Sequence, residues 1–349
     1  MASGAAVLEI DGIDVNVSNP DKIFFEQLGL TKMDLVSYYL SVMPGVLRGC
    51  GDRPTLLKRY PNGADGEFFY QKRVPPSHPE WIDTATVTFP SGRTADFLLP
   101  TNGAHVIWAI NLGCIDLNPW PVRSADLDHP DELRLDLDPT VGVPWSDVRR
   151  VALLVKEILE EHGLIGFPKT SGKRGMHINA RIEPRWGFKE VRRAALGLAR
   201  AIEQLEPKAT TAWWKEERHG VFIDYNQNAR DRTVASAYSV RPSSDGRVST
   251  PLRWEEVARV DPAKHTISTV PRRFKKSGDP TEEIDRKAGR IDSLLKLADS
   301  QEEKGAADAP WPPHHPKQKG EPPRRRPSQN PRSPAKKGGR RGSKGGQTD

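Results

Sequence analysis

The chain has 349 residues, a formal net charge of +7 and a hydrophobic content of 36%, which is low for a sequence that packs along its whole length. No apolar run approaches the ~18 residues of a membrane span, and the first residues lack the pattern of a signal peptide. Cys50 and Cys114 form no CxxC pair and are expected to be reduced core thiols. These features argue against a membrane protein and a disulfide framework, and they predict a cytosolic protein.

The positive charge lies at the C-terminal end. Residues 317–349 contain eleven Lys and Arg against two acidic residues, a balance of +9, so 42 basic and 44 acidic side chains remain elsewhere. We therefore predict a folded domain over 1–300 and a disordered, basic, Pro- and Gly-rich tail over 301–349. Clustered Lys and Arg bind phosphate without a fold, so the tail is expected to contact nucleic acid, with a solubilising role as the alternative.

In the first part of the chain, apolar spacing and turn residues alternate between helix and strand patterns. Thr31 is expected to begin a helix that continues to residue 47. The other predicted elements are a strand, turn and strand over 54–73, a short hairpin over 84–96 and a buried helix over 104–113.

Further along, a helix capped by Ser146 is expected over 144–163. It is followed by a hairpin over 167–184, a helix over 188–206, and two strands that end in Asp224 and Arg241. Strands and helices are intermingled with several hairpins. The expected fold class is therefore α+β, with mixed, largely antiparallel sheets flanked by helices.

The segment LRLDLDP at 133–139 alternates leucines with charged residues. Such alternation predicts a half-buried strand with the leucines toward a core and the charged side chains away from it, namely Arg134, Asp136 and Asp138. Residues i and i+2 are about 7 Å apart at Cα, so both carboxylates can reach one ion. A solvated outer face without an ion is the alternative reading.

Other charged residues carry the same signal. Asp224 ends an apolar strand, Arg241 follows another, and His177 lies beside a Gly-flanked tip that contains Lys173 and Arg174. If these strands are neighbours, three carboxylates and several cations share one face. Such carboxylates suit Mg²⁺ or Mn²⁺, and the cations suit a polyphosphate, which together indicate phosphoryl or nucleotidyl transfer.

A set of motifs now occurs in a familiar order over about residues 10–300: NPDKIFF, LTKMDLVSYY, LLKRYPNGADGEFFYQK, HVIWAINLG, LRLDLDP, TSGKRGMHI, VFIDYNQNARDRTVASAYSVR and VSTPLRWEEV. With them the chain resembles the polymerase domain of bacterial DNA ligase D, a member of the archaeo-eukaryotic primase superfamily. The resemblance implies a primase-polymerase fold with an RRM-like catalytic part. A KxDG adenylation motif is absent, so we expect a free-standing homologue without a ligase module.

The resemblance also assigns roles to individual residues. It implies that Mn²⁺, the preferred ion, or Mg²⁺ is held by Asp136, Asp138 and Asp224. It implies that the incoming nucleotide is contacted by Ser171, Arg174, His177, Arg218, Gln227 and Arg241, although the family usually has Lys at the position of Arg174. Contacts to DNA, including a downstream 5′-phosphate, are implied for Lys22, Lys32, Phe68, Phe69 and His105.

Two of these assignments compete with structural explanations. Phe68 and Phe69 are consecutive on a strand and point to opposite faces, so we expect one in the core and the other on a template base. His105 has apolar neighbours and has an equally good structural explanation.

The function implied by the resemblance is template-directed nucleotidyl transfer that fills gaps and extends ends in non-homologous end joining. A preference for ribonucleotides is expected, with Ku and a separate ATP-dependent ligase as partners and a cytoplasmic, nucleoid-associated location. The alternatives are a primer-independent primase, which uses the same carboxylates, and a non-catalytic adaptor that binds DNA ends.

Overall fold

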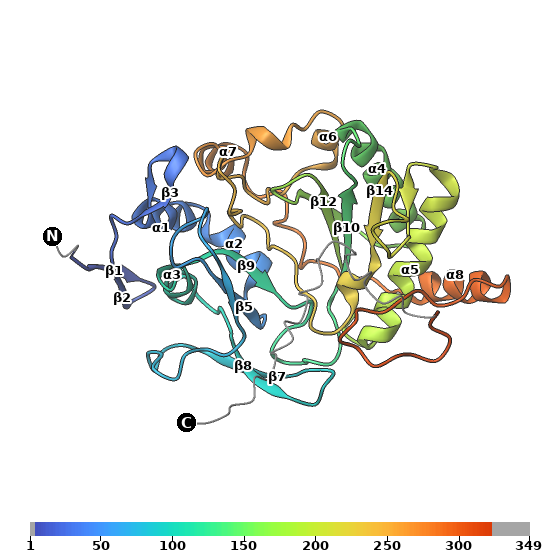
Figure 1. The fold of residues 1–349 in the computed structure, drawn as a ribbon, viewed down its shortest axis with the longest axis horizontal. Helices are drawn as coiled ribbons and strands as arrows, with labels where there is room; N and C mark the ends of the chain where they lie inside the picture. Colours follow the sequence, from blue (N-terminus) through green and yellow to red (C-terminus); the bar gives the residue numbers. More distant parts are fainter. Residues whose placement is uncertain (1–3, 323–349) are drawn as a thin grey trace, which may run out of the picture.

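The computed structural model describes residues 4–322, so the part of the predicted basic tail from residue 323 to residue 349 lies outside the described residues. In Figure 1 two sheets lie side by side, one from each half of the chain. The sheet of the second half consists, in spatial order, of β11 (Gly166–Thr170), β12 (Met176–Arg181), β10 (Glu132–Pro139), β14 (Val221–Asp224) and β13 (Ala209–Thr210). Its helices are α4 (Trp145–Glu161), α5 (Phe188–Leu205) and α8 (Asp292–Glu303).

The second half has the β-α-β-β-α-β order of RRM-like folds, in the sequence β10, α4, β11, β12, α5, β14. Numbered along the chain, β10, β11, β12 and β14 are strands 1 to 4, and across the sheet they lie in the order 2, 3, 1, 4 with antiparallel pairing. Only the short β13, at the edge beside β14, is parallel to its neighbour. This topology confirms the predicted α+β class and the RRM-like catalytic part.

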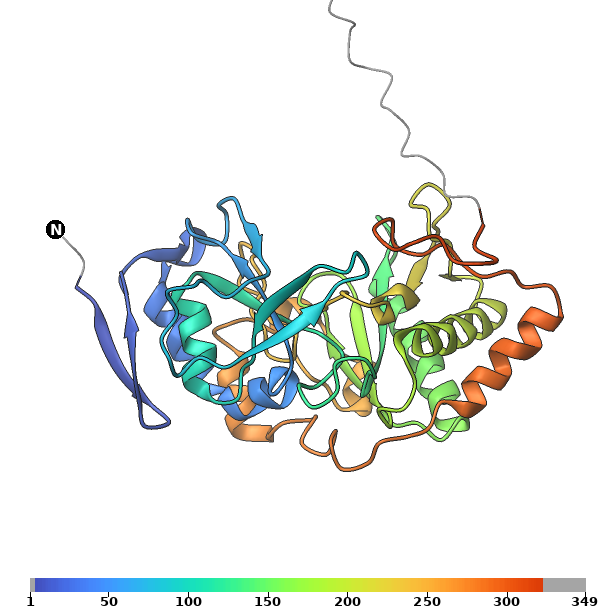
Figure 2. The same cartoon turned by 90° about the horizontal axis from the view of Figure 1, so that it is seen from below.

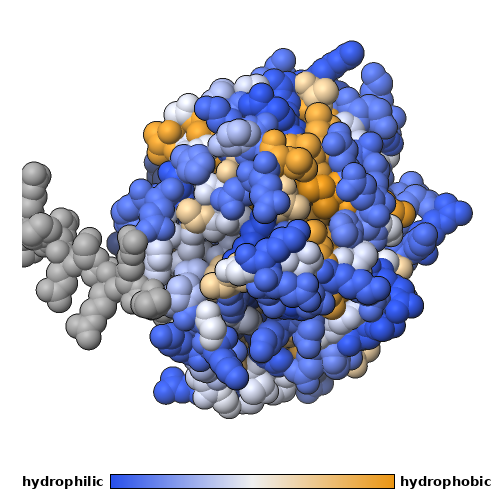
Figure 3. All heavy atoms as spheres, turned by 90° about the vertical axis from the view of Figure 1, so that its right-hand side faces the viewer, coloured by the Kyte–Doolittle hydropathy of each residue, from blue (hydrophilic) through white to orange (hydrophobic). Residues whose placement is uncertain are grey.

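The helices α4 and α5 lie against one face of this sheet, and α8 packs on the outer side of α5 (Figure 1). On the covered face the three alternating leucines of β10 are at most 1% exposed and pack against α4 and α5, namely Leu133, Leu135 and Leu137. Figure 3 views the side that carries α5 and α8, where a band of hydrophobic residues crosses a mostly hydrophilic surface. The burial of these three leucines shows that the alternation in LRLDLDP separates a core face from a polar face, as predicted.

The first half contains a second antiparallel sheet, β6 (Phe69–Gln71), β5 (Thr55–Arg59), β8 (Thr94–Leu98) and β7 (Thr84–Thr88), with β9 (Cys114–Pro119) also paired with β5. Around it lie α1 (Lys32–Ser41), α2 (Met43–Cys50), α3 (Gly103–Asn111) and the small ladders β1 (Ala6–Ile10) with β2 (Ile13–Val17) and β3 (Ile23–Phe25) with β4 (Leu30–Thr31). The chain also returns to this half, where Tyr238, Val248 and Val270, the first residue of α7 (Val270–Ser277), share its core. The short α6 (Trp254–Val257) between them packs on α4 and β11 of the second half. Short 3₁₀ helices are η1 (Glu26–Leu28), η2 (Tyr225–Asn228) and η3 (Pro262–Lys264). No helix of residues 4–322 combines the length and apolar character that crossing a membrane requires.

Helix boundaries follow local chemistry. Thr31 caps α1 through a reciprocal hydrogen-bond pair with Asp34, as predicted. The expected single helix over 32–47 is two helices, since Pro44 has no N–H to continue the first and instead lies in the first turn of the second. Ser146 lies inside α4, whose N-cap is Pro144.

Two further expectations are wrong. Residues 233–241 form no strand but an irregular segment with one isolated bridge, Val240 to Val248. The folded part also continues past residue 300: α8 ends at Glu303, and residues after it run back along α5 toward η2 (Figure 2). Trp311 is 6% exposed and lies 4.1 Å from the guanidinium of Arg192, so the segment up to residue 322 belongs to the folded domain.

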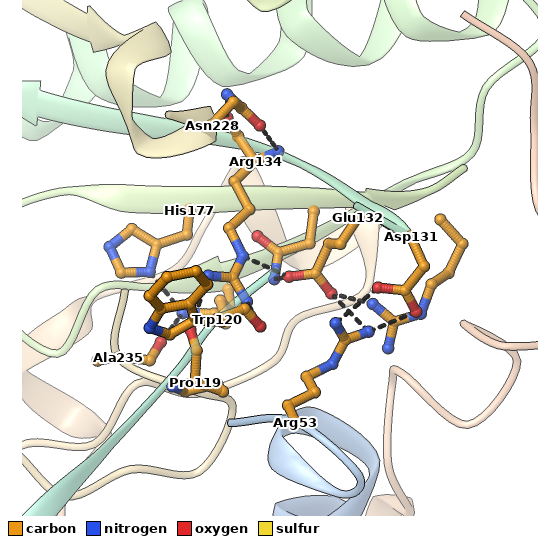
Figure 4. A network of polar contacts seen from close by, with 12 residues as sticks. Arg53, Pro119, Trp120, Asp131, Glu132, Arg134, His177, Asn228 and Ala235 are labelled. Atoms are coloured by element: carbon orange, nitrogen blue, oxygen red, sulfur yellow. Dashed lines mark hydrogen bonds and ion pairs between the residues drawn. The ribbon is translucent and has the colours of Figure 1, made fainter. Parts of the chain in front are cut away.

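A buried ion network joins the two halves at the polar face of the catalytic sheet (Figure 4). Glu132 is 3% exposed and pairs with Arg134 at 2.7 Å and with Arg181. Arg53, from the first half, makes two hydrogen bonds of 2.6 and 2.7 Å to Asp131. Although burial alone acts to raise it, the surrounding guanidinium groups hold the pKa of Glu132 far below its usual range.

We expect Glu132→Gln to lower the free energy of unfolding by about 3–5 kcal/mol, because it leaves buried guanidinium groups without their counter-charge. Denaturant unfolding measures this change. The matched control is Glu160→Gln, which removes an exposed pair with Lys156 at 3.6 Å and should change stability by less than about 1 kcal/mol. Equal effects of the two variants would contradict a supporting role for the network.

Candidate active site

The strand register places four polar residues in one row across the open face of the catalytic sheet. Asp136 on β10 lies opposite His177 on β12 and, on its other side, opposite Asp224 on β14. Lys169 on β11 lies opposite His177 and completes the row. Asp138, two residues after Asp136, is on the same face and more exposed. The predicted convergence of the three aspartates and His177 on one face is thus confirmed.

His177 is held between a cation and a carboxylate. The Lys169 ammonium donates to Nδ1 of His177, to the carbonyl of Ala235 at 2.7 Å and to the hydroxyl of Ser249 at 2.8 Å. Burial, and then Lys169, hold the pKa of His177 well below its usual range. A neutral ring that accepts at Nδ1 carries its hydrogen on Nε2, which lies 3.4 Å from Asp136.

The carboxylates are crowded. Burial, followed by the charges of Asp224 and Asp138, raises the pKa of Asp136 to about 8. The side-chain amide of Gln227 donates to Asp224 at 2.9 Å and lies 3.5 Å from Asp136, so it links the two acids. The ligand oxygens of the three aspartates are nevertheless not all within 4.8 Å of one another. This open set of hard oxygen donors has the chemistry that a divalent cation completes.

A cavity of about 260 Å³ lies over Asp136 and His177 and receives residues from both halves of the chain. Its walls include four residues that the sequence analysis did not single out for the site: Lys58, Tyr70, Asp116 and Asn118. Desolvation lowers the pKa of Lys58 and Lys173, and the nearby Arg241 contributes to both shifts. Cations that depress one another's pKa make this cavity suited to a polyanion such as a triphosphate.

Arg241 reaches the cavity although it ends no strand. Its guanidinium lies 3.1 Å from the buried carboxylate of Asp116. Gly172, at φ +68°, allows the hairpin tip to approach it, since a Cβ there would lie 2.4 Å from the Arg241 side chain. Ser171 shapes the same tip, because its hydroxyl accepts from the amides of Lys173 and Gly175 at 3.2 and 3.1 Å.

The remaining predicted nucleotide contacts lie at the rim. Arg174 is exposed at the hairpin tip and is not part of the cavity wall. Arg218 stacks over Phe222 at 3.5 Å and donates to the carbonyls of Ala212 and Trp213. Burial lowers the pKa of Arg218, and the nearby carboxylates of Asp224 and Asp138 act in the opposite direction.

Lys22 and Lys32 lie together in the first half of the chain. The Lys32 ammonium is buried and donates to carbonyls of Ser18 at 2.6 Å and Asn111 at 3.2 Å, while Lys22 donates to the Pro61 carbonyl at 2.6 Å. Burial, and then the charge of Lys22, lower the pKa of Lys32. Carbonyls do not neutralise an ammonium, so this pair of charges suits a terminal phosphate.

Two expectations about DNA-contacting residues need correction. Phe68 and Phe69 do point to opposite faces, toward Lys58 and Arg59 respectively, but neither is in the core, since they are 48% and 46% exposed. His105 is 1% exposed, and its ring nitrogens contact the backbone of Thr101 and Trp81 at 3.2 and 2.6 Å. Its place inside the protein supports the structural explanation and not a DNA contact.

Some of the missed residues had a signal in the sequence. The position of Lys169 opposite His177 follows from the hairpin once the length of its tip is known, because residues 166–170 then pair with residues 176–180. Asp116 lies in an apolar stretch, CIDLNP, where one buried acid marks a charged partner. Nothing in the sequence indicated that this partner is Arg241.

Comparisons with known proteins agree with this geometry. The model of the LigD primase-polymerase domain family matches residues 31–281. The multifunctional non-homologous end joining protein LigD of Mycobacterium bovis is 31% identical over 294 residues, which are 81% of this chain and 38% of that protein. The bifunctional non-homologous end joining protein LigD of Bacillus subtilis is 29% identical over 264 residues, 74% of this chain and 42% of that protein. The chain thus spans less than half the length of these relatives.

A solved structure, the polymerase domain from Mycobacterium tuberculosis ligase D in complex with DNA, superposes with a TM-score of 0.74 and 29% identity over 78% of this chain and 99% of that one. The family match covers both the catalytic sheet and the cavity above it. On this evidence, the chain belongs to the LigD primase-polymerase domain family.

Proposed function

We propose that this protein is a metal-dependent, template-directed nucleotidyltransferase that fills short gaps and extends ends in non-homologous end joining. The observation that carries the proposal is the row of Lys169, His177, Asp136 and Asp224 beneath a cation-lined cavity. Such a row offers oxygen ligands on one side and anion-binding groups on the other, which nucleotidyl transfer requires together. The membership of the family and the names of the relatives support it.

In this mechanism Asp136, Asp138 and Asp224 hold Mn²⁺, the ion we expect to be preferred, or Mg²⁺. When bound, the cation supplies activation of the primer 3′-hydroxyl and charge neutralisation at the triphosphate. The chain's own cations at the cavity wall, Lys58 and Lys173, bind and orient the triphosphate. His177 keeps its Nε2 hydrogen directed toward the cavity because Lys169 occupies Nδ1.

The DNA partner is proposed to be a gap or broken end with a downstream 5′-phosphate, bound by Lys22 and Lys32. The exposed ring of Phe68 lies 5.5 Å from Tyr70 and 4.2 Å from the Lys58 ammonium, a combination that suits stacking on an unpaired base. Ribonucleotide preference, partnership with Ku and a separate ligase, and a cytoplasmic, nucleoid-associated location complete the proposal, on the basis of the resemblance alone.

The first test is extension of a primer across a short gap with Mn²⁺ and either ribo- or deoxyribonucleotides. We expect templated extension by the parent and a loss of at least roughly 10³-fold with Asp136→Ala, because a required oxygen ligand is gone. Asp147→Ala, on α4 away from the cavity, is the control. DNA binding without extension under any metal would favour the adaptor, and synthesis without a primer would favour the primase.

A pH dependence follows from the raised pKa of Asp136. Its carboxyl is protonated at neutral pH without a cation, and ion binding must displace that proton. Affinity for Mn²⁺ should therefore rise roughly tenfold per unit from about pH 6 to about pH 8 and level off above it. Calorimetry at several pH values measures this rise, and a constant affinity over that range would contradict it.

The same shift gives a stability control in the metal-free protein. A carboxyl whose folded pKa lies above its unfolded value contributes stability below the unfolded pKa of about 3.9, and that contribution is lost as the pH rises through about 8. In Asp136→Asn the side chain is a neutral amide at every pH, so no buried charge forms at alkaline pH. It should therefore melt at a higher temperature than the parent at alkaline pH while it loses Mn²⁺ binding. Equal melting temperatures of the two proteins at alkaline pH would argue against the raised pKa.

The 5′-phosphate contact is tested with Lys22→Gln. We expect the parent to bind gapped DNA roughly tenfold more tightly when the downstream end is phosphorylated, and the variant to lose most of that preference. Lys189→Gln, which removes an exposed ammonium on α5, should keep it. The comparison is made at one salt concentration, since general phosphate attraction depends on salt. An intact preference in the Lys22 variant would reject the assignment.

A further inference from the structure

Apart from the catalytic row, one cluster of metal-ligating side chains lies between the loop after η2 and the segment after α8. It consists of Asp231, His314 and His315. Among the described residues 4–322, these are the only three His, Cys or acidic side chains whose ligand atoms all lie within 4.8 Å of one another. The histidines are more than eighty positions away from the aspartate in the sequence, so only folding brings them together.

We propose that Asp231, His314 and His315 form a second divalent-cation site, one that binds Zn²⁺ or a similar borderline ion and is separate from the catalytic carboxylates. Two imidazoles and one carboxylate form a ligand set that suits Zn²⁺ or Co²⁺ better than Mg²⁺, which prefers oxygen alone. This inference does not depend on the proposed polymerase activity.

The distances agree with such a site. Nε2 of His314 lies 2.7 Å and Nε2 of His315 lies 3.7 Å from the same oxygen, Oδ1 of Asp231. Ligand atoms at tetrahedral angles around zinc, each about 2.1 Å from the ion, are about 3.4 Å apart. Both observed separations differ from that value by less than an ångström, so small side-chain movements accommodate an ion.

The local backbone directs these side chains inward. Neighbouring residues in an extended chain point to opposite sides, but a turn closed by the hydrogen bond from His315 N to Pro312 O places both rings on one side, with centroids 4.8 Å apart. Asp231 has φ +65°, a conformation that residues other than glycine rarely adopt. The backbone carbonyl of Arg230, 3.0 Å from Nε2 of His315, offers a fourth oxygen at the same point.

The environment combines burial with access. The side chains of Asp231 and His315 are 10% and 5% exposed, and Trp311 packs against the His315 ring with centroids 5.4 Å apart. The His314 side chain is 45% exposed and lines a cavity of about 670 Å³ that also contains Gln227 of the catalytic site.

A cation here would fix the C-terminal segment to the loop that follows Asp224 and Gln227. Its three bonds, to Asp231, His314 and His315, would then hold one wall of the cavity beside the active site. Without the cation, the same groups form hydrogen bonds of limited strength between two surface segments. Occupancy is therefore expected to stabilise the folded chain, since an ion that binds only the native state raises its stability by mass action.

The test uses the full chain with Zn²⁺ or Co²⁺ alone, without nucleotide or DNA. Equilibrium dialysis should find one Zn²⁺ per chain that Asp136→Ala retains and that His314→Ala loses, with affinity at least roughly tenfold weaker in that variant. Co²⁺ bound to the parent should show visible d–d absorption that is absent in the same variant. His314 is half exposed, so its removal leaves the fold intact; Asp231→Asn provides a second, isosteric variant.

The matched control is His129→Ala, which removes a histidine that pairs with the single exposed carboxylate of Asp126 at 2.8 Å. It should leave Zn²⁺ binding unchanged, and Zn²⁺ should raise the melting temperature of the parent and of this control but not of His314→Ala. Absence of a bound ion in the parent, or equal binding by His314→Ala, overturns the proposal and leaves the three residues as a hydrogen-bonded tie.

Discussion

The pairing of β10 with β12 on one side and β14 on the other is the constraint on which the rest of the site depends. It sets Asp136 opposite both His177 and Asp224. Because side chains alternate along a strand, a shift of one residue in either ladder would move His177 or Asp224 out of this row and toward the leucine core. The leucines therefore do more than stabilise the sheet: their burial against α4 and α5 specifies the register that aligns the acids.

A face with this much charge is maintained by two different balances. Near the N-terminal end of β10, Glu132 lies among arginines that compensate its negative charge and join the two halves of the chain. Farther along β10, burial, followed by the charges of neighbouring acids, raises the pKa of Asp136 to about 8. The charge of Glu132 is thus compensated within the protein, whereas the acids around Asp136 form a cluster with a strongly perturbed pKa, a feature typical of functional sites.

The cavity is built from both halves, which explains why the first half is more than a scaffold. Lys58 and Asp116 come from β5 and β9, and Arg241 comes from the irregular segment that leads back to that half. These charged groups of the cavity wall thus approach the acidic row from the opposite side. A change in how the halves pack would alter the cavity without altering the carboxylates themselves.

The sequence by itself determined which residues of one strand share a face, because alternation along a strand is a local property: this placed Asp136 and Asp138 together and set His177 apart from its apolar neighbours. That the strands of His177 and Asp224 flank β10 was an expectation, which the observed strand pairing confirmed. Only the tertiary structure decided the contacts between distant segments. Arg241 meets Asp116, Trp311 covers Arg192, and His314 and His315 reach Asp231, all across separations that no local pattern encodes. Exposure of both Phe68 and Phe69 was likewise decided there, since a strand covers a core only where another element packs on it, and no element within residues 4–322 buries either ring.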